Sequence, residues 1–196
     1  PGIWDGSASA NDLGTKGEGI IVGIIDSGIN ADHPSFADID SVGYNHTNPL
    51  GAGHYLGVCD PASLDYDPSF LCNDKLIGAY EYAYLAVDQA DPNILEYPTP
   101  EDESGHGSQV ASIVAGNVHQ AVMKVPAPIL TTKISGVAPH ANLVVYDACY
   151  RQNSLGDETC PGSALTAALD QALADGVDVL NYSISESIDP ANDLIE

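Results

Sequence analysis

Basic residues are scarce in this sequence. Its 196 residues include five lysines and arginines against 28 aspartates and glutamates, which gives a formal net charge of −23. A surface of this sign repels phosphate groups, so the composition excludes nucleic acid as a partner and disfavours association with anionic membranes. We interpret the excess as a solvated acidic shell. Tolerance of saline surroundings is an alternative, because ~1 M salt shortens the screening length to about 3 Å.

Long apolar runs are also missing. No stretch approaches the roughly 18 apolar residues of a membrane helix, so we expect no membrane-spanning segment. No basic segment followed by an apolar core stands at Pro1, so we expect no signal peptide, and a secreted form would have lost its leader. The 44% of hydrophobic residues is a globular balance, and a chain of this length can bury the core of one domain.

Metal-binding motifs are absent as well. The four cysteines fall in two close pairs, Cys59 with Cys72 and Cys149 with Cys160, and neither pair has the spacing of a zinc site. No calcium loop of the D-x-D-x-D type is present, although some carboxylates could hold calcium. We therefore expect no required cofactor. The even number of cysteines in short loops predicts two local disulfides and an oxidising compartment, with four buried free thiols as the alternative.

Three continuous apolar runs predict strands that are buried on both faces of a parallel sheet. They are residues 20–25 (IIVGII), 143–146 (LVVY) and 177–180 (VDVL). Residues 163–176 predict a helix with Ser163 as its N-cap, Gly176 as its C-cap and one apolar face formed by Leu165, Ala168, Leu169, Ala172 and Leu173. A second helix, rich in small residues, is expected at about 107–117. The predicted fold class is α/β, a parallel β-sheet flanked by helices.

Two segments show no such periodicity. Residues 44–103 are rich in Gly, Pro, Asp and Tyr and include one cysteine pair, which predicts a long surface insertion stapled by a disulfide. Residues 119–135 contain Pro126 and Pro128 and predict a second irregular stretch. We otherwise expect the whole of 1–196 to belong to one domain.

Asp26 directly follows the first apolar strand and precedes Ser27 and Gly28. In open α/β sheets, ligands bind beyond the carboxyl ends of the strands, which makes an aspartate at this position a candidate functional residue. Burial of its carboxylate requires hydrogen bonds, and the turn that follows can donate backbone N–H groups. A turn-forming aspartate without a catalytic role is the alternative interpretation.

His106 lies between two glycines near the expected start of the second helix. The positive end of a helix disfavours the imidazolium form, so we expect a neutral ring that can accept a proton. A histidine in this role is usually oriented by a carboxylate on its other ring nitrogen, and Asp26 could supply it. A structural capping histidine is the alternative. Of the other histidines, we expect a structural role for His33 and surface positions for His46, His54, His119 and His140.

Four motifs give the sequence a resemblance to a known family. Residues 24–29 (IIDSGI) with His33 and Pro34 resemble the aspartate motif of subtilisin-like serine proteases, and residues 105–111 (GHGSQVA) resemble their histidine motif. Residues 136–139 (GVAP) and 176–183 (GVDVLNYS) are also similar to segments of that family, in the same order. The resemblance implies a subtilisin-like fold, of which this chain would be the N-terminal portion, and a secreted serine endopeptidase acting on proteins or peptides.

One branch of the family is more similar than the others. Residues 56–59 (LGVC) and 72–79 (CNDKLIGA) resemble the cucumisin-type subtilases of plants and their bacterial relatives. This resemblance implies disulfides between Cys59 and Cys72 and between Cys149 and Cys160. It also implies secretion as a zymogen whose propeptide is removed, and a protease-associated domain that is often inserted further along the chain.

The resemblance also assigns roles to individual residues. The family triad runs Asp, His, Ser along the chain, so Asp26 would orient the ring and His106 would take the proton of the serine. Residues Ser183, Ile184 and Ser185 match the segment that pairs with the substrate backbone as an added strand. The segment around 150–155 would form the opposite side of the substrate cleft.

Three departures from the family pattern stand in the sequence. Ser108 and Gln109 occupy positions where the family usually has Thr and His, which predicts changed packing near the helix. Ser35 replaces a calcium-binding aspartate of many subtilisins, so that calcium site is not expected. No G-T-S-x-A nucleophile motif occurs in the 196 residues, and no oxyanion-hole asparagine can be placed in them.

We therefore expect the nucleophile beyond residue 196, together with the second half of the sheet. The 196 residues alone should cleave nothing and should leave an apolar sheet edge. Their serine could also stand on a second chain of a nicked but assembled enzyme. A serine-less relative that binds peptides or inhibits proteases is the alternative function, and a metal hydrolase is less well supported because one Asp and one His are too few ligands.

Overall fold

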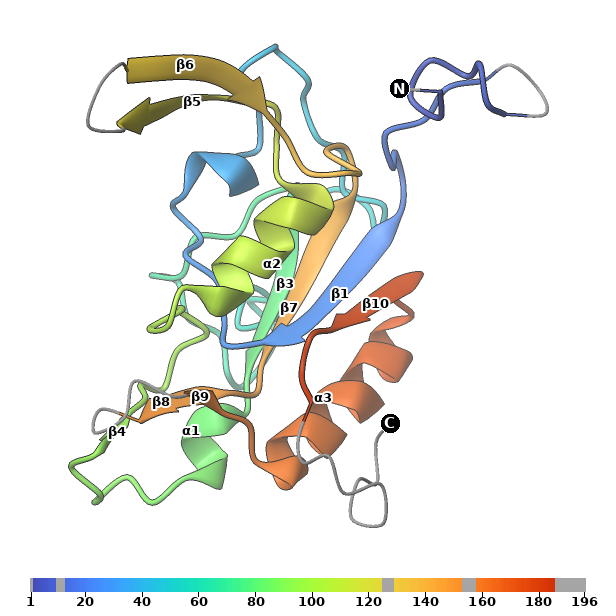
Figure 1. Cartoon of the computed structure of the whole chain (residues 1–196). Helices are drawn as coiled ribbons and strands as arrows, with labels where there is room; N and C mark the ends of the chain where they lie inside the picture. The colour runs from blue at the N-terminus through green and yellow to red at the C-terminus, as the bar shows by residue number, and fades with distance from the viewer. Residues whose placement is uncertain (1, 10–12, 125–128, 153–157, 186–196) are drawn as a thin grey trace.

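The computed structural model describes residues 2–9, 13–124, 129–152 and 158–185. Its largest sheet has five parallel strands in the order β10-β1-β7-β3-β2 (Figure 1). The strands are β1 (Ile21–Asp26), β2 (Leu56–Gly57), β3 (Leu76–Glu81), β7 (Asn142–Asp147) and β10 (Val179–Tyr182). The predicted α/β class with a parallel sheet is therefore confirmed.

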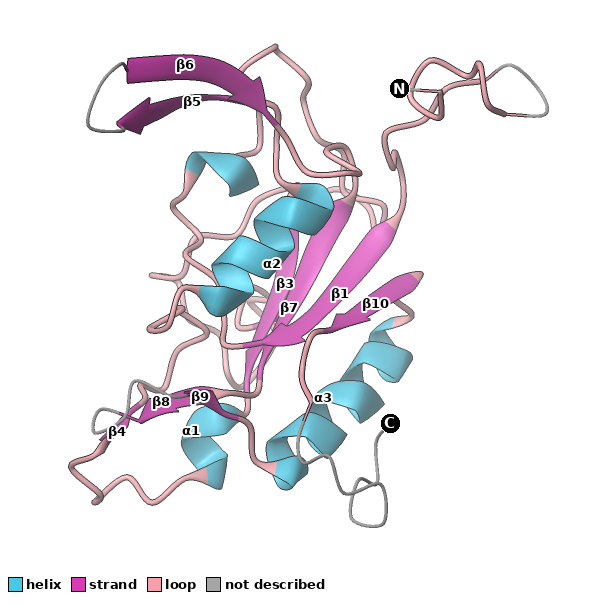
Figure 2. Ribbon diagram, viewed as in Figure 1, coloured by secondary structure: helices cyan, strands magenta, loops and turns pink. Residues whose placement is uncertain are grey.

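Helices cover both faces of this sheet (Figure 2). On one face, α2 (His106–Ala115) packs Ala111 and Ala115 in a cluster with Ile24 of β1. On the other face, α3 (Gly162–Asp175) packs Leu165 in a cluster with Ile25. Consecutive residues of a strand point to opposite faces, so the unbroken apolar run of β1 is buried by a helix on each side.

The helix α3 confirms the predicted element but not all of its details. Gly176 has a left-handed conformation and ends the helix with its N–H, as expected. Ser163 is not the N-cap, because the helix begins one residue earlier and Pro161 precedes it without a side-chain cap. Leu173 does not belong to the buried face, since its side chain is 83% exposed, whereas Ala164 is buried. The position of Leu173 lies too far around the helix from Leu165 and Ala168 to reach the sheet.

The two segments predicted to be irregular contain regular structure. Within 44–103, β3 lies inside the main sheet between β7 and β2, so this part is not a surface insertion. The segment also contains α1 (Ala83–Ala86) and β4 (Ile94–Leu95). Within 119–135, β5 (His119–Lys124) pairs antiparallel with β6 (Ile129–Ile134), which corrects the second prediction. A short 3-10 helix, Pro34–Phe36, follows β1.

Two disulfides join the four cysteines. Cys59 pairs with Cys72, and Cys149 pairs with Cys160, which confirms both pairings and rules out free thiols. The second disulfide connects the loop after β7 to the start of α3, close to a three-stranded sheet of β4, β8 (Tyr150–Gln152) and β9 (Glu158–Thr159). Among the described residues, no helix has the length and apolar character needed to cross a bilayer.

The strand β10 forms one edge of the main sheet. Among the described strands it pairs only with β1, and the side chains of Val179 and Leu180 are 52% and 37% exposed. A parallel strand buried on both faces is normally covered by helices and flanked by further strands. An apolar parallel strand at a bare edge matches the expectation of an open sheet on this side.

Candidate active site

Asp26 stands at the carboxyl end of β1, in register with Asp147 at the end of β7. Its side chain is fully buried. The Oδ1 atom accepts a hydrogen bond from the backbone N–H of Ser27 at 2.9 Å, while Oδ2 has no hydrogen-bond partner among the described residues. The expected donation from the following turn is therefore present. A buried carboxylate with so few donors still requires a polar partner.

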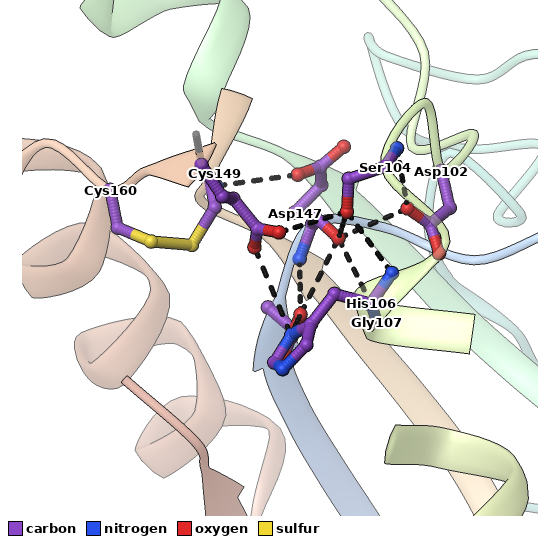
Figure 3. The surroundings of a disulfide bond; sticks show 10 residues. Asp102, Ser104, His106, Gly107, Asp147, Cys149 and Cys160 are labelled. Atoms are coloured by element: carbon purple, nitrogen blue, oxygen red, sulfur yellow. Dashed lines mark hydrogen bonds and ion pairs between the residues drawn. A yellow bond between two sulfur atoms is a disulfide. The ribbon is translucent and has the colours of Figure 1, made fainter. Parts of the chain in front are cut away.

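The imidazole of His106 is that partner. Its Nδ1 lies 2.6 Å from Oδ1 of Asp26, a distance typical of a strong, charge-assisted hydrogen bond. Figure 3 shows His106 beside Ser104, Gly107 and Asp102. The His106 side chain is 45% exposed, whereas Asp26 is fully buried. The carboxylate therefore holds the ring from the protein side, and the ring remains accessible from solvent.

The first turn of α2 is fixed by a second buried carboxylate, Asp102. Its Oδ1 accepts hydrogen bonds from the backbone N–H groups of Ser104 and Gly105, and its Oδ2 accepts one from Ser108. Oδ1 also lies 3.0 Å from the hydroxyl oxygen of Ser27. Asp102 therefore satisfies helix N-terminal donors, complements the positive end of the helix dipole and connects α2 to the turn that carries Asp26.

The two glycines beside His106 allow this close approach. A Cβ on Gly107 would lie 2.3 Å from the carbonyl oxygen of Gly28, so only glycine lets the helix pack against the turn after β1. The N–H of Gly107 donates to the Ser27 hydroxyl at 3.0 Å. Gly105 has a positive φ of 85°, a conformation that favours glycine. Gly107 is therefore required by close packing against the turn, and Gly105 by its backbone conformation, since the space beside Gly105 is open.

The surrounding carboxylates raise the pKa of His106 above 6.5, mainly through the hydrogen bond with Asp26. Glu158 contributes, since its Oε1 lies 3.9 Å from Nδ1, and burial raises the pKa of the Glu158 carboxyl itself. Its other oxygen accepts a hydrogen bond from the Ser104 hydroxyl at 2.9 Å. The pKa of the ring is therefore shifted in the direction opposite to the one expected for a helix N-terminus, because the neighbouring carboxylates favour the imidazolium form.

The chain is similar to known proteins over most of its length. Residues 17–194 match the model of the subtilase family, which covers most of the chain. The chain belongs to the subtilase family. It is 40% identical over 177 residues to subtilisin-like protease SBT2.2 of Arabidopsis thaliana, covering 90% of the chain and 19% of that relative. It is 41% identical over 180 residues to subtilisin-like protease SBT2.3 of the same plant, covering 89% of the chain and 19% of the relative.

This subtilase chain thus spans about a fifth of the length of the curated relatives that it matches. Subtilisin-like protease SBT2.4 of Arabidopsis thaliana is 35% identical over 196 residues, which is 97% of the chain and 22% of the relative. The residues matched by the family model, 17–194, include the positions of both Asp26 and His106.

The other residues predicted for the site lie in two segments, one directly after β10 and one that begins with β8. Ser183, Ile184 and Ser185 directly follow β10 at the sheet edge, where Ile184 packs partly against the core and Ser183 is exposed. Their proposed contact with substrate stays a prediction. Of the opposite segment around 150–155, only residues 150–152 lie in the described part, as β8.

Ser108 and Gln109, which depart from the family pattern, have different surroundings in the structure. The Ser108 hydroxyl accepts a hydrogen bond from the backbone N–H of Asn30 at 2.9 Å, so it joins α2 to the loop after β1. Gln109 is exposed to solvent. Ser35 is buried at the 3-10 helix, and its N–H donates to a ring nitrogen of His33, which confirms a structural role for that histidine.

Two histidines predicted at the surface are buried. His46 is 2% exposed, and one ring nitrogen lies 2.7 Å from the Asn117 side-chain oxygen. His140 is 8% exposed and lies 2.6 Å from a carboxylate oxygen of Glu18. Their sequence context is typical of surface loops and does not indicate that these loops pack over the N-terminal edge of the sheet. His54 is exposed as expected, and His119 is partly buried.

Sequence reasoning missed Asp102, Ser104 and Glu158. Asp102 could have been recognised, because an acidic residue just before a helix is a common N-terminal signal. Glu158 carries no such signal, since it reaches His106 only through the folding of β9 against this end of the sheet.

Proposed function

We propose that the 196 residues supply the aspartate and histidine of a Ser-His-Asp triad in a secreted serine endopeptidase. The supporting observation is the 2.6 Å contact between Nδ1 of the accessible His106 ring and the buried Asp26 carboxylate. With Nδ1–H donated to Asp26, the other ring nitrogen is free to take a proton from a serine hydroxyl and pass it to the leaving amine. Asp26 stabilises the imidazolium that forms in between.

The nucleophile would come from sequence beyond these residues. The chain contains no nucleophile motif, yet it matches relatives that are about five times its length. The bare apolar edge at β10 is the side on which the remaining strands would add. The serine-bearing part could be continuous with this chain or be a second chain produced by cleavage, and these residues alone would be inactive.

The substrates would be proteins or peptides. An extended substrate backbone would pair with Ser183 to Ser185 as an additional strand beside the sheet. The two disulfides support an extracellular site of action, where such bonds persist. The negative charge supports the absence of nucleic-acid partners. No cofactor takes part in this chemistry.

A fluorophosphonate probe followed by denaturing mass spectrometry tests the proposal. The native preparation should carry one label on a serine that stands in a subtilase nucleophile motif. His106→Ala in the serine-bearing enzyme should abolish labelling and reduce kcat by several orders of magnitude. His54→Ala is the matched control, because His54 is exposed and makes none of the contacts described for the site, and it should label normally.

A preparation that never labels, although it is folded and contains the serine-bearing part, would refute the endopeptidase proposal. A chain that binds peptides without labelling would instead be a serine-less binding relative. Normal turnover in His106→Ala would remove His106 from the proposed role.

A further inference from the structure

A second group of carboxylates lies at the same edge of the sheet, outside the proposed triad. Glu81 ends β3 and Asp147 ends β7, and the two residues are paired in register. Glu96 comes just after β4 in the segment that crosses over this edge. One carboxylate oxygen from each of the three residues lies within 4.8 Å of the other two. Segments far apart in the sequence thus bring three carboxylates to one point.

Each carboxylate of this cluster has a hydrogen-bond donor at only one of its two oxygens in the described part of the chain. One oxygen of each residue accepts a hydrogen bond from a backbone N–H group. Glu81 accepts from Tyr84 at 2.8 Å, and Glu96 accepts from Tyr97 at 3.3 Å. Asp147 accepts from Cys149 at 3.5 Å, as Figure 3 shows. The second oxygen of each residue is buried and has no hydrogen-bond partner in the described part of the chain. Asp147 is fully buried. Three neighbouring carboxylates therefore each keep one buried oxygen without a donor, which is costly unless a positive charge or protons neutralise the cluster.

No side chain in the described residues supplies that charge. The ion pairs found there involve only His106 and His140, and neither pairs with this cluster. Burial, with the nearby charge of Glu103, raises the pKa of Glu81 to about 8, and burial with the charges of Glu81 and Glu103 raises the pKa of Glu96 to about 9. The pKa of Asp147 is also raised well above its ordinary value by burial. Raised pKa values are the expected consequence of buried carboxyl groups that lack a positively charged partner.

The donor set selects the kind of cation. All three side chains offer oxygen, and none offers nitrogen or sulfur, which favours a hard cation over zinc or copper. Ca²⁺ accepts 6–8 oxygen ligands in flexible geometry, including carboxylates that bind through one or both oxygens, and water completes its coordination. Mg²⁺ requires a stricter octahedron and retains most of its water. Ligands from three separate segments also explain why the sequence shows no D-x-D-x-D loop.

We propose that Glu81, Glu96 and Asp147 bind one Ca²⁺ ion that fastens the segment 83–103 to the ends of β3 and β7. The proposal does not rest on the peptidase activity. The ion would also support the proposed catalytic turn, because a Cβ on Gly28 would lie 2.9 Å from Oδ2 of Asp147. The carboxylate of Asp147 therefore lies close to the turn after Asp26.

Terbium luminescence and thermal unfolding of the complete polypeptide, stripped with EDTA, test this proposal. Tb³⁺ is a luminescent stand-in for Ca²⁺, and Tyr97 beside Glu96 can sensitise it. Addition of Tb³⁺ should give emission that Ca²⁺ displaces. Ca²⁺ at a hundredfold excess over its Kd should raise the Tm by about 5–10 °C.

Glu96→Gln removes one ligand charge with almost no change of shape, and Asp170→Asn on the exposed side of α3 is the matched control. We expect Glu96→Gln to lower Ca²⁺ affinity at least about tenfold and to lose most of the Tm shift, while Asp170→Asn behaves as the unmodified protein. Glu81→Gln provides a second ligand variant, should the first be poorly folded by circular dichroism.

Equal Ca²⁺ affinity and equal Tm shifts in both ligand variants and the control would overturn the proposal. So would an unmodified protein whose Tm is the same in EDTA and in Ca²⁺. In that case protons, rather than a cation, neutralise the cluster. Because the readouts are binding and unfolding, they remain informative even if the peptidase proposal fails.

Discussion

Replacing Asp102 by alanine should both weaken the fold and slow the reaction. The carboxylate accepts hydrogen bonds from the N–H groups of Ser104, Gly105 and Ser108 at 3.1, 2.7 and 2.7 Å, and it contacts the Ser27 hydroxyl at 3.0 Å. Loss of a helix cap costs about 0.5–2 kcal/mol. A buried donor left without a partner costs about 1–3 kcal/mol more. Since Ser104 and Gly105 are partly accessible to water, we expect a total loss of about 2–4 kcal/mol.

Urea unfolding of the serine-bearing enzyme measures this loss, with Asp170→Ala as a control for removal of an exposed carboxylate. Asp102→Asn retains an acceptor oxygen and should lie between the two. Because His106 is the first residue of α2, loosening that turn displaces the ring, and kcat should fall more than KM rises. A destabilisation below about 1 kcal/mol together with an unchanged kcat would refute the reasoning.

Three further predictions concern the same site. Asp26→Asn should lower kcat about 10⁴-fold in a peptide assay, the magnitude that triad aspartates have in other serine proteases. Because its pKa is raised, His106 should set an acid limb in the pH profile of kcat/KM above pH 6.5. Glu158→Gln should move that limb to lower pH, and the movement should be smaller in high salt. A limb that does not move would contradict this prediction. Replacing Cys149 and Cys160 by serine should cost about 3 kcal/mol in urea unfolding.

The sequence predicts those elements whose local pattern agrees with their environment in the fold. The run IVGIID reads as a doubly buried strand, and it is one, with α2 and α3 on its two sides. The run LIGAYE of β3 has the same character, but the Gly, Pro and Asp residues around it favoured a loop, and only its pairing with β7 makes it a central strand. The pair of β5 and β6 was missed because its polar and apolar residues suggest no buried face.

The candidate site likewise contains residues that the sequence predicts and residues that it does not. Asp26 and His106 lie in motifs that carry a family resemblance, so their proximity could be expected from the sequence alone. The roles of Asp102 and Glu158 could not, because the resemblance assigns them none and their contacts join α2 to β1 and β9. The raised pKa of His106 is a consequence of these contacts. Local helix-end reasoning therefore gave the wrong direction for this group.

The ends of three neighbouring strands show how the covering segment decides the chemistry of a strand end. The runs IVGIID, NLVVYD and LIGAYE each finish on an acidic residue, and these are in register at one edge of the sheet. Above Asp26 stands the first turn of α2, which brings an imidazole. Above Asp147 and Glu81 lies the segment 83–103, which brings a further carboxylate, Glu96. The same position in the sheet therefore gives a hydrogen-bonded acid–base pair in one case and, in the other, a cluster of carboxyl groups for which the described side chains supply no positive charge.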